Sequence, residues 1–383
     1  MHAVVIGAGA FGGWSALFLR RVGWRVTLVD AWGPGNSRAS SGGETRIIRS
    51  IYGNDLISVR MAARALVLWK EHEQRWRKTL YARTGMLFLA AKDDPFLAES
   101  QAALADENIA FEVLSPTEAA HRFPQISFDD TGSMLFEPDA GALFARENCR
   151  TVVEQFVAEG GNFIRAAARR PSVKNSRATL ELTSGDSLHA DMYVFACGPW
   201  MGQLFPDVIG SRIQPTRQEV LFFGTPAGDV SFNADVMPCW ADRTSELKFY
   251  GLPSIQNRGF KLASDLRGPV FDPDSEDRTV SPSTVAAVRE YLRHRFPKLA
   301  DTPLIESRVC QYENSPDLGL IIDRHPEAAN VWLVGGGSGH GYKHGPAIGE
   351  YVAERMASGV APSSEFGLAR LETTNTQGRS STI

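Results

Sequence analysis

Residues 7–12 contain three glycines in the pattern Gly7-x-Gly9-x-x-Gly12, directly after the apolar residues 4–6. In a strand–turn–helix unit, the first glycine makes the tight turn, the second lets the backbone approach a diphosphate, and the third packs helix on strand. Asp30 ends the next predicted strand, 26–29, where a carboxylate accepts hydrogen bonds from a ribose diol. The pattern predicts a dinucleotide-binding unit. It fits NAD and FAD equally, because both contain ADP.

A second glycine-rich turn, Gly335–Gly341, lies between a predicted strand, Val331–Val334, and a predicted helix from about Pro346. Such a turn directs the positive end of a helix into a site, and in a flavoenzyme that end belongs near the pyrimidine edge of the flavin. Lys343 either adds a full charge there or is solvated. His340 and His344 are spaced like a metal pair. However, the glycines between and beside them argue against a helix, and no third ligand is apparent, so no metal site is predicted.

Two further segments contain reactive or charged side chains. Arg46 and Arg49 follow a Ser/Gly-rich stretch, and in an extended chain they project to different faces. One could meet a flavin and the other a carboxylate, since a guanidinium group matches a carboxylate in shape. Cys310 lies in the otherwise polar run 308–312. A lone cysteine is more often a small core residue than a nucleophile.

The elements that must position these side chains alternate along the chain without repeats. Strands dominate between about 215 and 310. This order predicts an α/β nucleotide-binding domain with a mostly β domain inserted into it. The predicted helices are 56–72, 94–105, 115–122, 144–159 and 283–296, and the predicted strands are 86–91, 178–182, 192–196, 217–224 and 247–251.

Composition excludes several classes of protein. The 383 residues contain 43% hydrophobic and 22% charged residues, with a net charge of −4 and no basic block, which argues against a nucleic-acid partner. No apolar run is long enough for a membrane span, and no signal peptide is recognisable, so we expect no membrane association. The four cysteines are scattered without a CxxC motif, which favours the cytoplasm. The polar end, Leu371–Ile383, is predicted to be disordered.

Four motifs in order carry a family resemblance. They are GAGAFG, TRIIRSIYG, VCQYENSPDLGLIIDRHP and GSGHGYKHG. With this spacing the chain resembles the monomeric sarcosine oxidase and N-methyltryptophan oxidase family, in the D-amino-acid oxidase superfamily of FAD enzymes. The resemblance runs from the first strand to about residue 366.

The resemblance implies roles for individual residues. Cys310 would hold FAD covalently through the 8α carbon, and Arg46 would lie by the flavin ring. Arg49 and Lys343 would bind a substrate carboxylate. Lys261 would activate oxygen. Tyrosines near the substrate map to Tyr250 and Tyr312, and Gly339, His340, Gly341 and Lys343 map to the cofactor-binding motif.

Two positions depart from sarcosine oxidases, which have a histidine at each. Gly42 stands before Thr45, and Asp265 stands four residues after Lys261. We expect Gly42 to open space for a bulkier substrate. Asp265 either pairs with Lys261 or faces the substrate and favours a cationic group. Sarcosine should therefore be a poor substrate.

The predicted fold class is α/β with two domains, a Rossmann-like FAD-binding domain and an inserted, mostly β substrate domain. The FAD-binding domain takes 1–80, 142–212 and 318–366, the substrate domain takes 81–141 and 213–317, and 367–383 form a flexible tail. The predicted function is oxidation of an amino or imino acid to an imine with release of hydrogen peroxide, by a monomer that uses molecular oxygen. The alternatives are an FAD-dependent dehydrogenase with another acceptor, an NAD-dependent dehydrogenase, and a flavin-binding protein without turnover.

Overall fold

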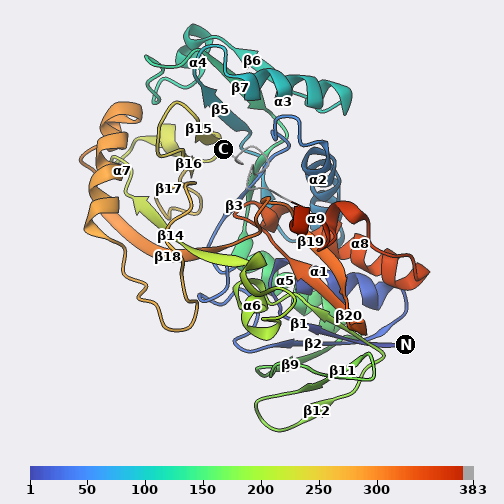
Figure 1. The fold of residues 1–383 in the computed structure, drawn as a ribbon. Coiled ribbons are helices and arrows are strands. Elements are labelled where there is room, and N and C mark those ends of the chain that lie inside the picture. The colour runs from blue at the N-terminus through green and yellow to red at the C-terminus, as the bar shows by residue number, and fades with distance from the viewer. Residues whose placement is uncertain (374–383) are drawn as a thin grey trace.

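A six-stranded sheet contains both strands of the nucleotide-binding unit predicted from the sequence. In the computed structural model, which describes residues 1–373, β1 pairs in parallel with β2 and β13, and β13 pairs in parallel with β20. The order is β19-β20-β13-β1-β2-β9. Its strands are β1 (His2–Ile6), β2 (Arg25–Asp30), β9 (Asn162–Arg165), β13 (Met192–Phe195), β19 (Ile321–His325) and β20 (Ala328–Gly335). The sheet occupies the lower part of Figure 1.

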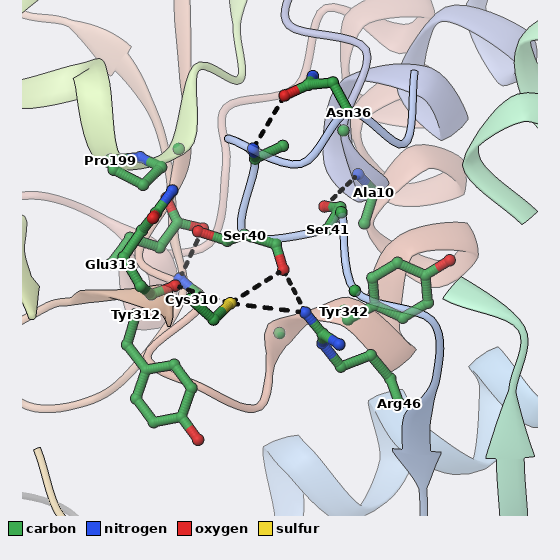
Figure 2. A pocket seen from close by; sticks show the side chains of 18 of the residues that line it. Ala10, Asn36, Ser40, Ser41, Arg46, Pro199, Cys310, Tyr312, Glu313 and Tyr342 are labelled. Atoms are coloured by element: carbon green, nitrogen blue, oxygen red, sulfur yellow. Dashed lines mark hydrogen bonds between the residues drawn. The ribbon is translucent and has the colours of Figure 1, made fainter. Parts of the chain in front are cut away.

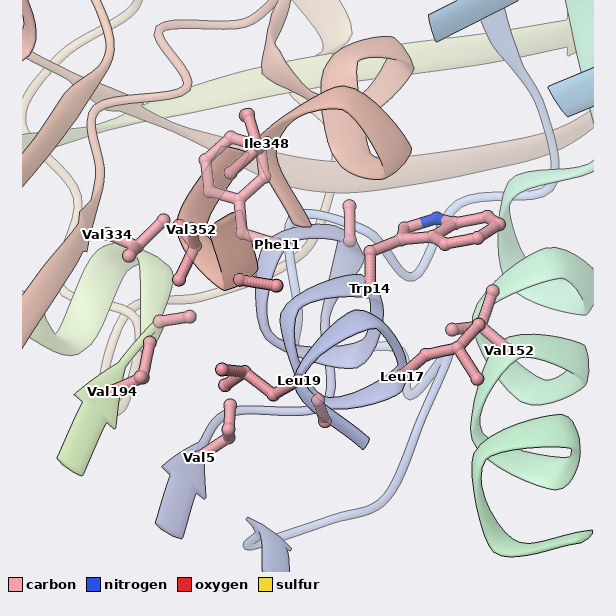
Figure 3. Packing of buried hydrophobic residues seen from close by; sticks show 14 of the residues in the cluster. Val5, Phe11, Trp14, Leu17, Leu19, Val152, Val194, Val334, Ile348 and Val352 are labelled. Carbon is pink, nitrogen blue, oxygen red and sulfur yellow. The ribbon is translucent and has the colours of Figure 1, made fainter. Parts of the chain in front are cut away.

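Helix α1 (Ala10–Arg21) follows β1 and is almost entirely buried between this sheet and its neighbouring helices. Apolar side chains of α1, with Trp14 and Leu17 among them, pack against α5 (Ala145–Ala158) and α8 (Gly345–Ser358), as Figure 3 shows. A Cβ at Gly349 would lie 2.6 Å from the backbone of Trp14, so only glycine permits this approach of α8 to α1. This packing holds the first turn of α1 firmly over the carboxyl end of β1.

A mixed eight-stranded sheet forms the second large layer, in the upper left of Figure 1. Its order is β18-β14-β17-β16-β15-β5-β7-β6. Its strands are β5 (Met86–Ala90), β6 (Glu112–Leu114), β7 (Ser133–Glu137), β14 (Gln214–Phe223), β15 (Cys239–Asp242), β16 (Phe249–Leu252), β17 (Phe260–Ser264) and β18 (Leu304–Asn314).

The two faces of this sheet have different environments, as the alternation of side chains along a strand requires. On β17, Phe260 and Leu262 belong to the core that packs on α7 (Pro282–Arg295). Lys261, which alternates with them along the strand, points to the opposite face, toward a cavity. One face therefore stabilises the sheet, and the other is available for chemistry.

Smaller elements complete the fold. A three-stranded sheet joins β3 (Arg46–Ile48), β8 (Gly141–Leu143) and β4 (Tyr81–Ala82), and another contains β10 (Ser172–Lys174), β11 (Arg177–Glu181) and β12 (Ser187–Leu188). The remaining helices are α2 (Leu56–Trp76), α3 (Pro95–Asp106), α4 (Pro116–Arg122), α6 (Met201–Leu204) and α9 (Arg370–Thr373), and short 3₁₀ turns include η1 (Gly198–Trp200) and η5 (Gly341–His344).

The helices and strands predicted from periodicity are confirmed, with ends displaced by a few residues. One prediction is wrong: residues 367–373 are not a flexible tail. Leu368 and Leu371 are buried, and Arg370 forms an ion pair with Asp317 at 2.7 Å, so this segment packs on the body of the protein. The rest of the predicted tail, 374–383, lies outside the described residues. The division into two domains stays a prediction.

Candidate active site

One cavity of about 740 Å³ is bordered both by the nucleotide-binding unit and by the face of the eight-stranded sheet that carries Lys261. Gly7 and Asp30 line one part of it, whereas Lys261, Cys310 and Lys343 line another. Figure 2 shows Cys310 and Tyr312, both from β18, close to Ser40 and Arg46, which belong to a distant part of the sequence. The cavity therefore unites motifs that are distant in the sequence.

The three glycines of the motif differ in what surrounds them. Gly7 has φ of +103°, and a Cβ there would lie 2.3 Å from the carbonyl oxygen of Ala196. A Cβ at Gly12 would lie 1.8 Å from the carbonyl oxygen of Gly7, which is the close contact between helix and strand expected from the motif. A Cβ at Gly9 would meet only the Ser41 hydroxyl at 3.2 Å. Gly9 thus leaves the backbone at the start of α1 accessible from the cavity.

Asp30 has several backbone donors. One carboxylate oxygen accepts the N–H of Ala8 at 2.8 Å, and the other accepts those of Trp32 at 2.9 Å and Gly33 at 2.6 Å. These bonds orient the carboxylate at the end of β2. Its place on the cavity wall agrees with the expected contact to a ribose.

Cys310 is half-buried and faces Arg46. A guanidinium nitrogen of Arg46 lies 3.8 Å from Cys310 Sγ, and the thiol lies 3.9 Å from the carbonyl oxygen of Ser40 (Figure 2). Arg46 itself donates to the carbonyl oxygens of Ser40 and Thr45, which fix its side chain. The Arg46 side chain and the Ser40 carbonyl oxygen thus border the thiol at the cavity wall.

Lys261 is 4% exposed. Its Nζ donates to the Thr45 carbonyl oxygen at 2.8 Å and lies 3.3 Å from the Thr45 hydroxyl. Burial, and secondly the charge of Arg46, lowers the pKa of Lys261 to about 7. The ammonium group is therefore partly deprotonated near neutral pH.

Lys343 is buried, not solvated. Its Nζ donates to the Tyr52 hydroxyl at 2.7 Å and to the His340 carbonyl oxygen at 3.1 Å. Burial and the charge of Arg49 hold the pKa of Lys343 well below its usual range. Arg49 is also buried, and its guanidinium carbon lies 4.5 Å from the centre of the Tyr52 ring. Two buried basic side chains, Arg49 and Lys343, thus contact one tyrosine.

Tyr250, Tyr312 and Asp265 form a chain of hydrogen bonds on the cavity wall. The two tyrosine hydroxyls are 3.4 Å apart, and Tyr312 donates to Asp265 at 3.1 Å. The second oxygen of Asp265 is 3.9 Å from Arg267. The pairing of Asp265 with Lys261 is not found, because Lys261 bonds to Thr45 instead. Asp265 lies on the Lys343 side, where its charge raises the pKa of that lysine.

The turn before α8 brings its residues close to the cavity. A Cβ at Gly339 would lie 2.6 Å from the Tyr312 ring, and one at Gly341 would lie 2.7 Å from Phe11. His340 bonds to Tyr52 and Leu318, and burial lowers its pKa to about 3. A 3₁₀ turn, η5, was not anticipated here. Within residues 1–373 no group of three or more His, Cys, Asp or Glu side chains is placed to hold a metal ion.

The interpretation of Gly42 as an opening is wrong. A Cβ there would lie 1.8 Å from the carbonyl oxygen of Asn36, so backbone already occupies the position of a side chain. The loop folds inward because residue 42 is glycine. Any room for a larger substrate must come from elsewhere in the cavity.

The sequence analysis missed four residues at this site: Thr45, Tyr52, Glu137 and Glu313. Thr45 and Tyr52 lie inside the TRIIRSIYG motif, which was a usable signal. Glu137 is fully buried and accepts the Ser50 N–H at 2.7 Å, and burial raises its pKa to about 7. No local pattern distinguished either glutamate from a surface acid.

Comparison with known proteins gives consistent results. The profile of the DAO family, described as FAD dependent oxidoreductase, matches residues 2–355. Monomeric sarcosine oxidase of Bacillus sp. (strain B-0618) is 30% identical over 361 residues, covering 93% of this chain and 92% of the relative. N-methyl-L-tryptophan oxidase of Salmonella agona (strain SL483) is 28% identical, covering 96% and 97%. The solved structure of L-proline dehydrogenase from P. horikoshii has a TM-score of 0.86 at 20% identity, with 97% of each chain covered, which shows a shared fold.

Proposed function

The chain belongs to the DAO family of FAD-dependent oxidoreductases, and from that premise we propose that it oxidises an amino or imino acid at the carbon–nitrogen bond, with oxygen as electron acceptor. The observation that carries this proposal is the meeting of Lys261, Cys310 and Lys343 on the walls of one cavity. The similarity to a sarcosine oxidase and an N-methyl-L-tryptophan oxidase supports this substrate class.

The residues present fit FAD. The glycine unit leaves backbone amides accessible at the start of α1, where the positive end of the helix attracts phosphate. Asp30 would accept the ribose hydroxyls, and Gly339, His340 and Gly341 would border the cofactor. When bound, FAD would accept the two electrons of the substrate C–H bond and pass them to oxygen, giving hydrogen peroxide.

Cys310 would attach the cofactor through its Sγ, and Arg46, whose guanidinium nitrogen lies 3.8 Å from that sulfur, would lie beside the flavin. Denaturing the protein with acid tests this attachment. Yellow colour that stays with the precipitate is expected, and it should be lost in Cys310→Ser. Flavin wholly in the supernatant of the wild-type protein would mean that FAD is bound without a covalent bond.

Arg49 and Lys343 would bind the substrate carboxylate and hold the adjacent carbon at a fixed place, which is catalysis by positioning. Tyr250, Tyr312 and Asp265 would then border the amine and the side chain. Lys261, on the same sheet face as Tyr250 and Cys310, would present its charge to oxygen. The names of the bacterial relatives support a monomer. A cytoplasmic location stays a prediction, and no helix in the described part of the chain is long and apolar enough to cross a membrane.

A panel of amino acids, imino acids and simple amines tests the function. Loss of flavin absorbance without air identifies a substrate, and peroxide formed in air identifies oxygen as the acceptor. Bleaching without peroxide would indicate a dehydrogenase with another acceptor. No bleaching by any compound would favour a flavin-binding protein without turnover.

A further inference from the structure

Glu313 is a buried acid on the cavity wall, at the end of β18, and it has no role in the function proposed above. Glu313 follows Tyr312 in the sequence, and Figure 2 shows its side chain beside Pro199. The residue is 8% exposed. Among the described residues, no ion pair includes it. A buried carboxylate without a cation is costly, so its protonation state needs an explanation.

The two oxygens of Glu313 differ. Oε1 accepts the N–H of Gly337 at 3.3 Å, which is a long bond, whereas Oε2 is buried and has no partner within residues 1–373. Glycines leave the room for this group. A Cβ at Gly337 would lie 2.8 Å from Oε1, and one at Gly198 would lie 3.5 Å from Oε2. The carboxyl group thus lies in a close-fitting part of the cavity wall, and one of its two oxygens is desolvated without a hydrogen bond.

The neighbours of Glu313 place it beside the nucleotide-binding unit. A Cβ at Gly337 would also lie 3.4 Å from Phe11, in the first turn of α1. The titratable groups near Glu313 are the Cys197 thiol and, farther away, Asp30. The charges of Glu313 and Asp30 both raise the pKa of Cys197, which lies close enough to interact with each of them. Burial raises the pKa of Glu313 to about 7, opposed only by the Gly337 amide. No basic side chain stabilises its charge.

Asp30 provides a useful contrast in the same cavity. Three backbone amides stabilise its carboxylate, so it suits the role of an acceptor. Glu313 has only one weak donor, and a negative charge there would lie near a site for diphosphate. The surroundings of Glu313 therefore favour the neutral carboxylic acid, whose O–H is a hydrogen-bond donor.

We propose that Glu313 binds FAD as the neutral acid, its carboxyl group donating one hydrogen bond to an acceptor oxygen of the diphosphate–ribityl part, so that FAD binding retains or takes up one proton. This inference rests on the assignment of the cavity to FAD. It deepens that assignment by adding a residue that the glycine motif does not contain. FAD affinity should consequently fall as pH rises through neutrality.

The test uses the full-length Cys310→Ser variant. FAD binding is reversible in this variant, whether or not the wild-type protein binds FAD covalently. The dissociation constant of FAD is measured from flavin fluorescence at about pH 6 and about pH 8. Lys261 and Glu137 also titrate near pH 7, so the matched control is Cys310→Ser with Glu313→Gln, which keeps both groups. The amide still donates a hydrogen bond but does not titrate.

Raising the pH from about 6 to about 8 should weaken FAD binding about tenfold more in Cys310→Ser than in Cys310→Ser with Glu313→Gln. This is the ratio expected when one proton must be bound together with FAD. Calorimetry in buffers of different ionisation enthalpy should show close to one extra proton taken up at about pH 8. Cys310→Ser with Lys261→Met should retain this uptake, which provides a test even if the glutamine variant does not fold.

Equal pH dependence with and without Glu313 would overturn the inference while leaving the FAD site in place. Loss of FAD binding in a folded glutamine variant at about pH 6 would also overturn it, because an ionised acceptor would then be required. Absence of FAD binding in every protein at both pH values would overturn the cofactor assignment as well.

Discussion

The Nζ of Lys261 donates to the main-chain oxygen of Thr45 at 2.8 Å, although the two residues are 216 positions apart. This bond joins β17 of the eight-stranded sheet to the segment that leads into Arg46 and Arg49. It also explains why Lys261 does not pair with Asp265. The lysine is held by neutral oxygens, so its charge is not cancelled by a carboxylate.

The first prediction concerns Lys261 and oxygen. Because its folded-state pKa is about 7, the lysine is charged below that pH and neutral above it. The rate at which reduced enzyme reacts with oxygen should therefore fall as pH rises through about 7. Stopped-flow reoxidation after anaerobic reduction measures this step separately from substrate oxidation.

Two variants sharpen that measurement. Lys261→Met should react slowly with oxygen at every pH, whereas Lys261→Arg should retain a rate that no longer falls above neutrality, since arginine stays protonated. Both should be reduced by substrate at nearly the wild-type rate. A methionine variant that reoxidises as fast as wild type would remove Lys261 from this role.

The second prediction concerns Arg49 and Lys343, the two buried basic side chains. Replacement of Lys343 by Met should lower kcat/KM tenfold or more, because charge-assisted hydrogen bonds contribute about 1.5–3 kcal/mol. Arg49→Gln should do the same. Flavin content of each variant is the control for folding. The proposal requires that the decarboxylated amine be a poor substrate of wild type, and an equally good amine would contradict it.

The third prediction concerns specificity at Asp265. Its carboxylate lies on the cavity wall between Tyr312 and Arg267, so a substrate with a second basic group should bind there favourably. We expect sarcosine to be poor and a larger or basic amino or imino acid to be better. A hydrogen-bonded site discriminates more sharply than an apolar one.

Asp265→Asn keeps the size of the side chain and removes its charge. The variant should lose about tenfold or more in kcat/KM for basic substrates, from the magnitude of a charge-assisted bond, and little for neutral ones. Steady-state kinetics on both classes measures this ratio. If sarcosine had the highest kcat/KM of wild type, the interpretation of Asp265 would be wrong, although the flavoenzyme assignment would stand.

The fourth prediction concerns stability at Gly42. Gly42→Ala places a Cβ 1.8 Å from the Asn36 carbonyl oxygen, and it should lower the free energy of unfolding by about 1–3 kcal/mol. Gly13→Ala is the matched control, because a Cβ in that helix would meet Val152 at an ordinary 3.5 Å and should be neutral or stabilising. Denaturant unfolding compares them. Equal effects of the two substitutions would contradict the packing argument.

Local patterns alone were sufficient to predict much of the fold. The first βαβ unit could be predicted because the apolar strand, the three glycines and Asp30 act on neighbours within 30 residues. Helices such as α2 and α7 carry their own periodicity and caps, with Asp55 and Ser281 as N-caps. The candidate residues Cys310, Lys261, Arg49 and Lys343 were found from motifs, and the structure brings them to one cavity.

The tertiary structure decided which of these side chains are buried and what they contact. The charge pattern around Lys343 did not show whether the lysine is buried, and the fold places it against Tyr52. Gly42 suggested space where backbone from Asn36 lies. Glu313 had no sequence signal, because its unusual state comes from desolvation by segments distant in the chain. Periodicity and turn chemistry are local, whereas burial and charge depend on long-range packing, and that is why only the fold could determine the electrostatics of this site.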